Sequence, residues 1–327
     1  MKKIVMVFVC FALVSMTTKA QTAKVALQHN GNVTLYDADK LADALTASVD
    51  GDTLYLNEGR FVGDVTITKK VSIIGSGTNT ILTGNVKVSI PSSPTLTSHL
   101  LDALYLENKG ITVTLPLKGL KIRKCIFSGL DFTALTEDIL IDRCFSRGSG
   151  SASLRLSKNV KNMSVINTKV NNLRGDAEYV GDANFINCNI YHLDNYYYDY
   201  TSNGEGSCRA TYLNCIIRDW NSSSTYYDSS TIYVNCLCGT NSFKKTVNQN
   251  CWNYNNLGIL DNSTNCSLTD DQLRSNNYLG TDGTVVGITG GTTPYTLVPA
   301  VPKVSDYTIK VDTETKKLNV NIKVKAN

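Results

Sequence analysis

The chain has 327 residues, with 32 lysines and arginines against 28 aspartates and glutamates, and its formal net charge is +4. Charged residues make up only 18% of the sequence and are scattered rather than gathered into a basic run. This distribution excludes the basic binding face of a typical nucleic-acid-binding protein, so no nucleic-acid partner is expected.

Residues 1–20 have the pattern of a secretory signal peptide. Two lysines precede an apolar run at residues 4–14, and small residues end at Ala20. The run is too short to cross a bilayer as a helix. Cleavage near Ala20 removes three lysines and leaves 29 basic minus 28 acidic residues, a net charge of +1. We therefore expect a secreted, periplasmic or cell-surface protein that starts near Gln21 and has no transmembrane segment.

A short amphipathic helix is predicted near the start of the mature chain. Apolar residues fall at helical spacing over residues 39–49, and Asp37 or Asp39 is available as the N-cap. Short β-type runs separated by turn residues follow over residues 53–90. A helix in this place would cover the open end of the strands that follow it.

The middle of the chain repeats a six-residue phrase six times. Three copies have apolar or aromatic residues, then Asn-Cys, with an apolar residue two positions after the cysteine. The fourth position of the phrase falls at Cys125, Cys144, Thr168, Cys188, Cys215 and Cys236. A period of 19 to 27 residues with variable inserts predicts the stacked coils of an all-β solenoid, in which each coil buries its apolar edge against its neighbours.

The cysteines of this register are predicted to form a mostly unbridged internal stack, because equivalent positions on successive coils lie about 4.8 Å apart. Cys208, Cys251 and Cys266 lie outside the register and are the expected places for any disulfide, whose pairing stays open. Zinc is not expected, since the cysteines and histidines lack the spacing of a tetrahedral site.

Asparagine precedes the register position in four coils, at Asn167, Asn187, Asn214 and Asn235. Asparagine tolerates a left-handed bend, and its amide can bond to an equivalent amide above or below, so an asparagine ladder is expected to begin at Asn167. Lys124 and Arg143 hold this position in earlier coils.

The end of the chain alternates apolar and polar residues on either side of residues 312–317, which predicts a β-hairpin. The predicted organisation is therefore a signal peptide at 1–20, a parallel β-helix at 21–302 and a hairpin tail at 303–327.

Three segments carry a family resemblance. Gly-Asp-Thr-Leu-Tyr-Leu-Asn-Glu-Gly at residues 51–59, Val-Ser-Ile-Ile-Gly at residues 71–75 and the repeated apolar-Asn-Cys bends resemble the pectin-lyase-like family of right-handed parallel β-helices. Residues 280–302 are similar to the closing segment of exported β-helix proteins from Bacteroidetes-type bacteria. The resemblance covers about residues 41–291 and implies a single-stranded right-handed parallel β-helix with an N-terminal capping helix.

The resemblance does not carry over a catalytic site. Of the motifs of polygalacturonase-type hydrolases the chain has only the pair Asp270-Asp271, which reads as the first turn of a small helix, and the pectin methylesterase motif is absent. Asp194 and Asp219, with Arg218 beside them, are the remaining catalytic candidates because they follow neighbouring register positions.

Aromatic residues gather in the loops that follow the register position. They are Tyr191, Tyr196, Tyr197, Tyr198, Trp220, Tyr226, Tyr227 and Trp252. Loops that leave equivalent bends project from one side of a solenoid, so these rings predict a strip that binds sugar rings through their apolar faces. The alternative is that the rings pack over the solenoid surface and hold the long inserts in place.

No cofactor is expected. Asp194, Asp199, Asn203 and Glu205 offer oxygens for calcium, but their spacing matches no known calcium loop. We expect a monomeric exported protein that contacts a polysaccharide or other glycan without catalysis. The alternatives are a divergent polysaccharide lyase or glycoside hydrolase, and a structural or adhesive module that binds a protein partner.

Overall fold

The structure is a computed structural model. It describes residues 23–92, 94–98, 100–148, 153–175, 182–194, 210–221, 228–239, 246–254, 268–297, 303–312 and 317–325. The predicted signal peptide lies outside the described residues.

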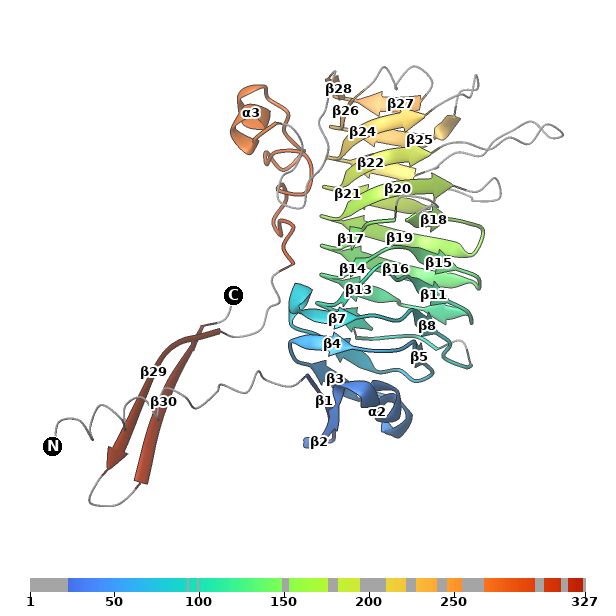
Figure 1. The fold of residues 1–327 in the computed structure, drawn as a ribbon. Coiled ribbons are helices and arrows are strands. Elements are labelled where there is room, and N and C mark those ends of the chain that lie inside the picture. Colours follow the sequence, from blue (N-terminus) through green and yellow to red (C-terminus); the bar gives the residue numbers. More distant parts are fainter. Residues whose placement is uncertain are drawn as a thin grey trace.

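The chain forms a parallel β-solenoid, and the predicted right-handed parallel β-helix is confirmed (Figure 1). Its first sheet, called sheet A, runs in the order β2 (Asn32–Asp37), β1 (Lys24–His29), β3 (Thr53–Leu56), β6 (Ser72–Ile74), β9 (Leu101–Asp102), β13 (Lys121–Arg123), β16 (Thr136–Asp142), β19 (Val160–Ile166), β21 (Ala183–Ile186), β23 (Ala210–Leu213), β25 (Asp228–Val234) and β27 (Thr246–Gln249), with β12 (Leu117–Lys118) beside β16.

The other two sides of the solenoid are columns of short strands that merge into one sheet. The second column is β4 (Gly59–Phe61), β7 (Thr80–Leu82), β10 (Tyr105–Leu106), β14 (Ile126–Phe127) and β17 (Phe145–Ser146). The third column is β5 (Val65–Ile67), β8 (Val86–Val88), β11 (Ile111–Val113), β15 (Leu130–Phe132) and β18 (Leu154–Leu156). Both columns end on β20 (Lys169–Gly175), which continues into β22 (Asn189–Asp194), β24 (Ile216–Asn221), β26 (Leu237–Cys238) and β28 (Trp252–Asn253).

One bend between sheet A and the second column repeats in every coil from β9 onward. The bend residue has positive φ at Ala103, Lys124, Arg143, Asn167, Asn187, Asn214, Asn235 and Asn250. The left-handed backbone conformation costs less free energy for asparagine than for most other residues, which explains why the later coils have asparagine at this bend. The repeat therefore extends one coil beyond each end of the six that the sequence pattern identified, to Ala103 and Leu104 before them and to Asn250 and Cys251 after them.

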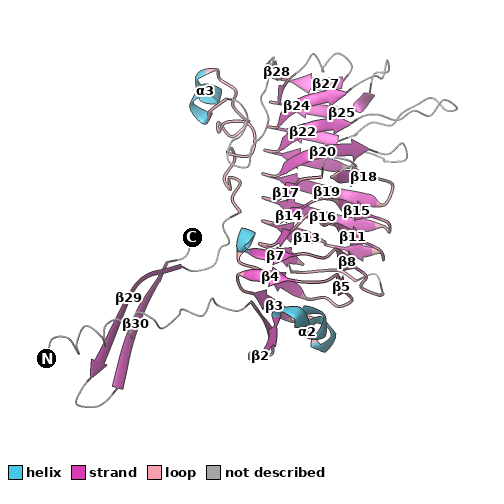
Figure 2. Ribbon diagram, in the orientation of Figure 1, coloured by secondary structure: helices cyan, strands magenta, loops and turns pink. Residues whose placement is uncertain are grey.

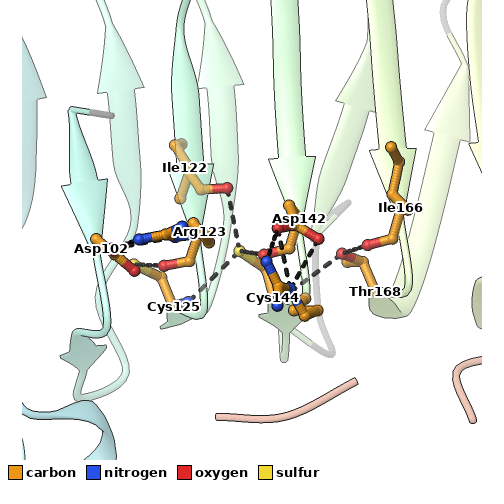
Figure 3. Close-up of polar contacts among 9 residues, drawn as sticks. Asp102, Ile122, Arg123, Cys125, Asp142, Cys144, Ile166 and Thr168 are labelled. Carbon is orange, nitrogen blue, oxygen red and sulfur yellow. Dashed lines mark hydrogen bonds and ion pairs between the residues drawn. The ribbon is translucent and has the colours of Figure 1, made fainter. Parts of the chain in front are cut away.

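The residue after the bend points into the solenoid, and the predicted thiol stack is confirmed. Cys125, Cys144, Cys188, Cys215 and Cys236 are buried and free. Each stack contact joins a backbone amide to the side chain of the next coil: Cys125 N donates to Cys144 Sγ (3.4 Å) and Cys144 N to Thr168 Oγ1 (3.1 Å), as Figure 3 shows. Cys251, placed outside the register in the sequence analysis, is also free and joins the stack, since Cys236 N contacts its Sγ at 3.5 Å.

Aromatic side chains extend the core on the sheet A side of the bend. Phe185, Tyr212 and Tyr233 occupy one register position in β21, β23 and β25, and each is fully buried. Their rings stack with centroids 5.2 and 4.9 Å apart and interplanar angles of 15° and 11°. Stacked rings of this kind contribute beyond the area that they bury, so this column ties three coils together.

The predicted N-terminal helix is confirmed as the 3₁₀ turn η1 (Ala38–Lys40) followed by α2 (Leu41–Ala47), and it contacts β5 at the end of the solenoid (Figure 2). Asp37 is the N-cap residue of η1, one of the two predicted positions, but its side chain makes no capping hydrogen bond and forms an ion pair with Lys24; Lys40 is the N-cap residue of α2. Sequence analysis missed the antiparallel hairpin β1–β2, which pairs with β3 and leaves β2 as the sheet edge.

Residues 279–295, here called the strap, run back along the outside of the bends. They follow α3 (Asp270–Ser275), which begins at the predicted place with Thr269 and Gln272 forming a capping box. Asn214 Oδ1 accepts from Thr281 N (3.2 Å), Asn189 Oδ1 accepts from Ile288 N (3.3 Å), and Asn167 Nδ2 donates to the carbonyls of Ile288 (3.1 Å) and Gly290 (2.8 Å).

The predicted asparagine ladder is therefore confirmed at only one of its three steps, and Asn187 Oδ1 is buried without a hydrogen-bond partner among the described residues. Asn235 Nδ2 donates to Asn214 Oδ1 at 3.4 Å, but the amide of Asn167 bonds to the strap. Close approach explains this difference. Gly291 has φ +77°, and a Cβ there would lie 2.2 Å from Asn187 Nδ2, so the strap backbone occupies the space beside the asparagine column.

The strap also buries side chains on the outside of the solenoid. They belong to the residues directly after the stack positions, which are in register from coil to coil. Ile216 and Leu237 form an apolar cluster with Leu273, Val285 and Val286. Lys169 on the same row is 1% exposed, and its Nζ lies 5.9 Å from the Phe145 ring centroid and 5.3 Å from that of Tyr295. The strap is thus an integral outer layer of the later coils.

The predicted C-terminal hairpin is confirmed. β29 (Lys303–Asp312) pairs antiparallel with β30 (Lys317–Lys325), and among the described residues neither strand joins another sheet. The remaining 3₁₀ turn is η2 (Gly77–Asn79). No described helix has the length and hydropathy needed to span a membrane.

Replacing Cys215 by serine tests the thiol stack. The hydroxyl is more costly to bury than the thiol, so we expect the free energy of unfolding to fall by about 1–3 kcal/mol in urea titrations. Thr66→Ala, at an exposed position, is the control and should stay within about 0.5 kcal/mol. Full labelling of Cys215 by a thiol reagent in the native protein would contradict its buried placement.

Replacing Asn167 by glycine tests the strap contacts without straining the left-handed bend. The variant loses two hydrogen bonds to the strap, which are worth about 1–3 kcal/mol together. We expect faster amide hydrogen exchange in residues 279–295, measured by mass spectrometry. Asn250→Gly makes the same change at an exposed bend and should leave strap exchange unchanged. Equal exchange rates in the two variants would show that Asn167 does not hold the strap.

Candidate functional site

The outer face of the third column carries a row of polar residues in register. Thr66, Lys87, Thr112 and Asp131 are paired across β5, β8, β11 and β15, and the row continues through Arg155 in β18 to Arg174 in β20. Successive strand residues point to opposite faces, and the neighbours of this row, such as Leu154 and Leu156, are buried. The row therefore faces outward because its neighbours fill the core.

A hollow of about 260 Å³ lies on this row. It is lined by Gly110, Ile111, Thr112, Gly129, Leu130, Asp131, Arg155 and Arg174. A Cβ at Gly110 would come within 3.1 Å of the Gly129 carbonyl oxygen, so small residues here let two coils approach closely at the wall of the hollow. Arg155 and Arg174 are register partners on adjacent strands, which brings two guanidinium groups to one site.

The same face continues onto β22 and β24, where the predicted catalytic residues lie. Asp194 is the register partner of Arg174, and Asp219 is the register partner of His192. The two aspartates are thus on adjacent strands, one coil and two residues apart, although their side chains lie outside what the structure describes. Register places Asp194 at the end of the arginine row and Asp219 on the row of Asn172 and His192, two residues away.

Among the described side chains, those of the predicted site residues Arg218 and Tyr191 are in contact. The Arg218 guanidinium carbon lies 4.2 Å from the centroid of the Tyr191 ring, within the range of a cation–π interaction. The sequence analysis assigned Tyr191 to a sugar-binding strip and Arg218 to catalysis. The structure places these two side chains in contact with each other at β22 and β24, and both assignments stay predictions.

Trp252 packs at the end of the solenoid. Its ring centroid is 5.4 Å from that of Tyr278, and it borders the apolar cluster beneath the strap. Trp220 is the register partner of Leu193, which is fully buried, and its own side chain is not among those described. Tyr196, Tyr197, Tyr198, Tyr226 and Tyr227 lie outside the described residues, so the aromatic strip as a whole stays a prediction.

A second group of charges lies at the bends between β9 and β16 and is paired internally (Figure 3). Arg123 Nε donates to Asp102 Oδ2 at 3.1 Å, and Arg143 Nε donates to Asp142 at 3.0 Å. The Asp102 hydrogen bond raises the pKa of Arg123, whereas burial lowers the pKa of Lys124. These ion pairs are formed within the group and favour a structural role for it, although Asp102 Oδ1 is buried without a hydrogen-bond partner in the part of the chain that the structure describes.

Among the described residues, no three or more aspartate, glutamate, histidine or cysteine side chains are grouped so that they could hold a metal ion. Asp199, Asn203 and Glu205 of the proposed calcium loop lie outside that set, so the calcium hypothesis remains untested. The sequence analysis did not single out Arg155 and Arg174. The signal that could have identified them is a charged residue between apolar ones in successive coils, as in Leu-Arg-Leu at residues 154–156 and Leu-Arg-Gly at residues 173–175.

A comparison with protein-family models found no match for this chain. A comparison with curated proteins found no match either.

Replacing Trp252 by alanine tests whether this ring serves packing. Trp252 is partly buried, so we expect a loss of about 1–3 kcal/mol, below the roughly 3–5 kcal/mol of a fully buried tryptophan. Thermal unfolding of the variant measures this loss. Tyr55→Ala, at an exposed ring on β3, should change stability by less than about 0.5 kcal/mol. An unchanged melting temperature for the Trp252 variant would show that the ring does not serve packing, and Trp252 would again be a candidate for sugar binding.

Proposed function

We propose that this chain is an exported, non-catalytic β-helix protein of the pectin-lyase-like kind that binds an acidic polysaccharide along the outer face of its third column. The observation that carries the proposal is the hollow at Arg155 and Arg174. Two register-paired arginines there face outward from a sheet whose other face is apolar core.

Arginine favours carboxylate and sulfate groups. Its planar guanidinium presents several donors that match an anionic oxygen pair, and charge-assisted hydrogen bonds are stronger than neutral ones. Thr112 and Asp131 on the same row add one hydroxyl and one acceptor, which suit the hydroxyl groups of a sugar. The site therefore fits a sugar unit that carries both acidic and hydroxyl groups.

An extended ligand fits this row better than a small anion does. The row offers one polar side chain for each coil, at a strand spacing of about 4.8 Å, from β5 to β20. Beyond it, Tyr191 and His192 on β22 continue the polar and aromatic surface. A polymer lying along the solenoid could contact several coils at once, and each contact would add to the affinity.

Polysaccharide cleavage is the second candidate, and one observation favours it. Asp194 ends the arginine row as the register partner of Arg174, and Asp219 lies on the adjacent strand as the register partner of His192. Two carboxylates near one glycosidic bond are what a hydrolase needs, and a carboxylate pair with a nearby arginine suits a lyase.

Replacing Arg174 by glutamine tests the binding proposal. We expect the chain from Gln21 to Asn327 to be retained on immobilised polygalacturonate or heparin and to pass through neutral dextran, with retention falling as salt rises. Loss of one charge-assisted hydrogen bond, worth about 1.5–3 kcal/mol, should weaken binding roughly tenfold or more.

Arg60→Gln is the matched control, since Arg60 lies in the second column and is ion-paired with Glu107. It should bind as tightly as the unchanged protein. Equal retention on dextran, or equal weakening by both substitutions, would refute the arginine site. Release of reducing ends or unsaturated products would instead support the cleavage alternative, with Asp194 and Asp219 as the first residues to replace.

A further inference from the structure

The thiol stack ends at a cysteine that differs from the others in its exposure. Cys125, Cys144, Cys188, Cys215 and Cys236 are fully buried, whereas Cys251, in the last described coil, is partly exposed. The Sγ atom of Cys251 lies 3.5 Å from the backbone nitrogen of Cys236, and both thiols are free. An oxidant from solvent can therefore reach Cys251, and Cys236 lies next to it inside the stack.

The backbone geometry of this pair suits a disulfide. The bends align Val234 with Gln249 before the two cysteines and Leu237 with Trp252 after them, so the cysteines are register neighbours on adjacent coils. Adjacent strands lie about 4.8 Å apart, within the roughly 4.4–6.8 Å between Cα atoms that disulfides span. The two residues are 15 apart in sequence, and closing a loop of this length restricts the unfolded chain.

The cysteine pairs deeper in the solenoid make the same contact, but both of their thiols are buried. Cys125 and Cys144 have the same amide-to-sulfur contact, at 3.4 Å, but neither is accessible. Cys188 and Cys215 repeat this arrangement. The pKa of Cys251 is itself raised, chiefly by its hydrogen bond with Cys236, so it is the lack of solvent access, not protonation, that protects the buried pairs.

We propose that Cys251 and Cys236 are an oxidisable pair that closes into a disulfide and staples the last coil of the solenoid to the coil before it. The oxidant is a disulfide of the thiol-exchange class. The Cys251 thiolate attacks one sulfur of that disulfide. Cys251 and the attacked sulfur form a mixed disulfide, and the other half of the reagent leaves as a thiol. The Cys236 sulfur then attacks Cys251 Sγ, forms the protein disulfide and releases the second thiol. Two protein thiols are oxidised, the reagent disulfide is reduced, and the two protons leave with the released thiols.

The experiment treats the native chain, residues 21–327, with 4,4′-dithiodipyridine and maps the products by peptide mass spectrometry. We expect a Cys236–Cys251 disulfide without retained reagent, and a melting temperature several degrees higher than before oxidation. In Cys236→Ala, Cys251 should keep the reagent as a mixed disulfide, because the resolving sulfur is missing. In Cys251→Ser, the thiopyridone that this pair releases from the reagent should no longer be detected. Oxidation of this variant should no longer raise its melting temperature.

Cys144→Ala is the matched control, since it removes one member of a buried pair with the same contact. It should form the Cys236–Cys251 disulfide as the unchanged protein does. Four results would overturn the proposal: reagent retained on Cys251 in the unchanged protein, a bridge from Cys251 to Cys208, Cys238 or Cys266, a bridge between two chains, or no reaction at Cys251.

Discussion

The structure depends on the in-register stacking of one bend. A residue with positive φ turns the chain from sheet A into the second column, and its backbone amide donates to the next coil, as from Lys124 N to Asp142 O and from Asn214 N to Val234 O, both at 2.9 Å. The following side chain enters the core. A coil that slipped by one residue would lose its hydrogen bonds and expose its inward side chains together, so the bend sets the register of all three sides.

The fold could be predicted because this bend constrains residue type in every coil. A small apolar side chain must follow a residue that tolerates the left-handed region, which produces the visible Asn-Cys repeat. The last coil was missed because Asn248 and Gln249 precede its bend where earlier coils have apolar residues. These two side chains are exposed at the end of sheet A, so the core does not select for apolar residues there.

The hydrogen-bond partners of side chains on the outside of the solenoid could not be predicted in the same way. An asparagine amide bonds equally well to another asparagine or to a backbone carbonyl, and the choice depends on what lies beside it. Asn167 bonds to residues 121 and 123 positions later in the chain, and no local pattern indicates that pairing. The hairpin β1–β2 is similar: its alternation is ordinary, and only its pairing with β3 shows that it closes the sheet A end.

The candidate site follows from the difference between inner and outer rows. Inner positions are limited to side chains that fill the core, so they repeat, whereas outer positions are hydrated and can vary at little cost to folding. Two arginines that are 19 residues apart in the sequence become neighbours only because their coils stack in register. Stacking therefore determines where the site lies, and the few outer residues that differ from coil to coil determine what it can bind.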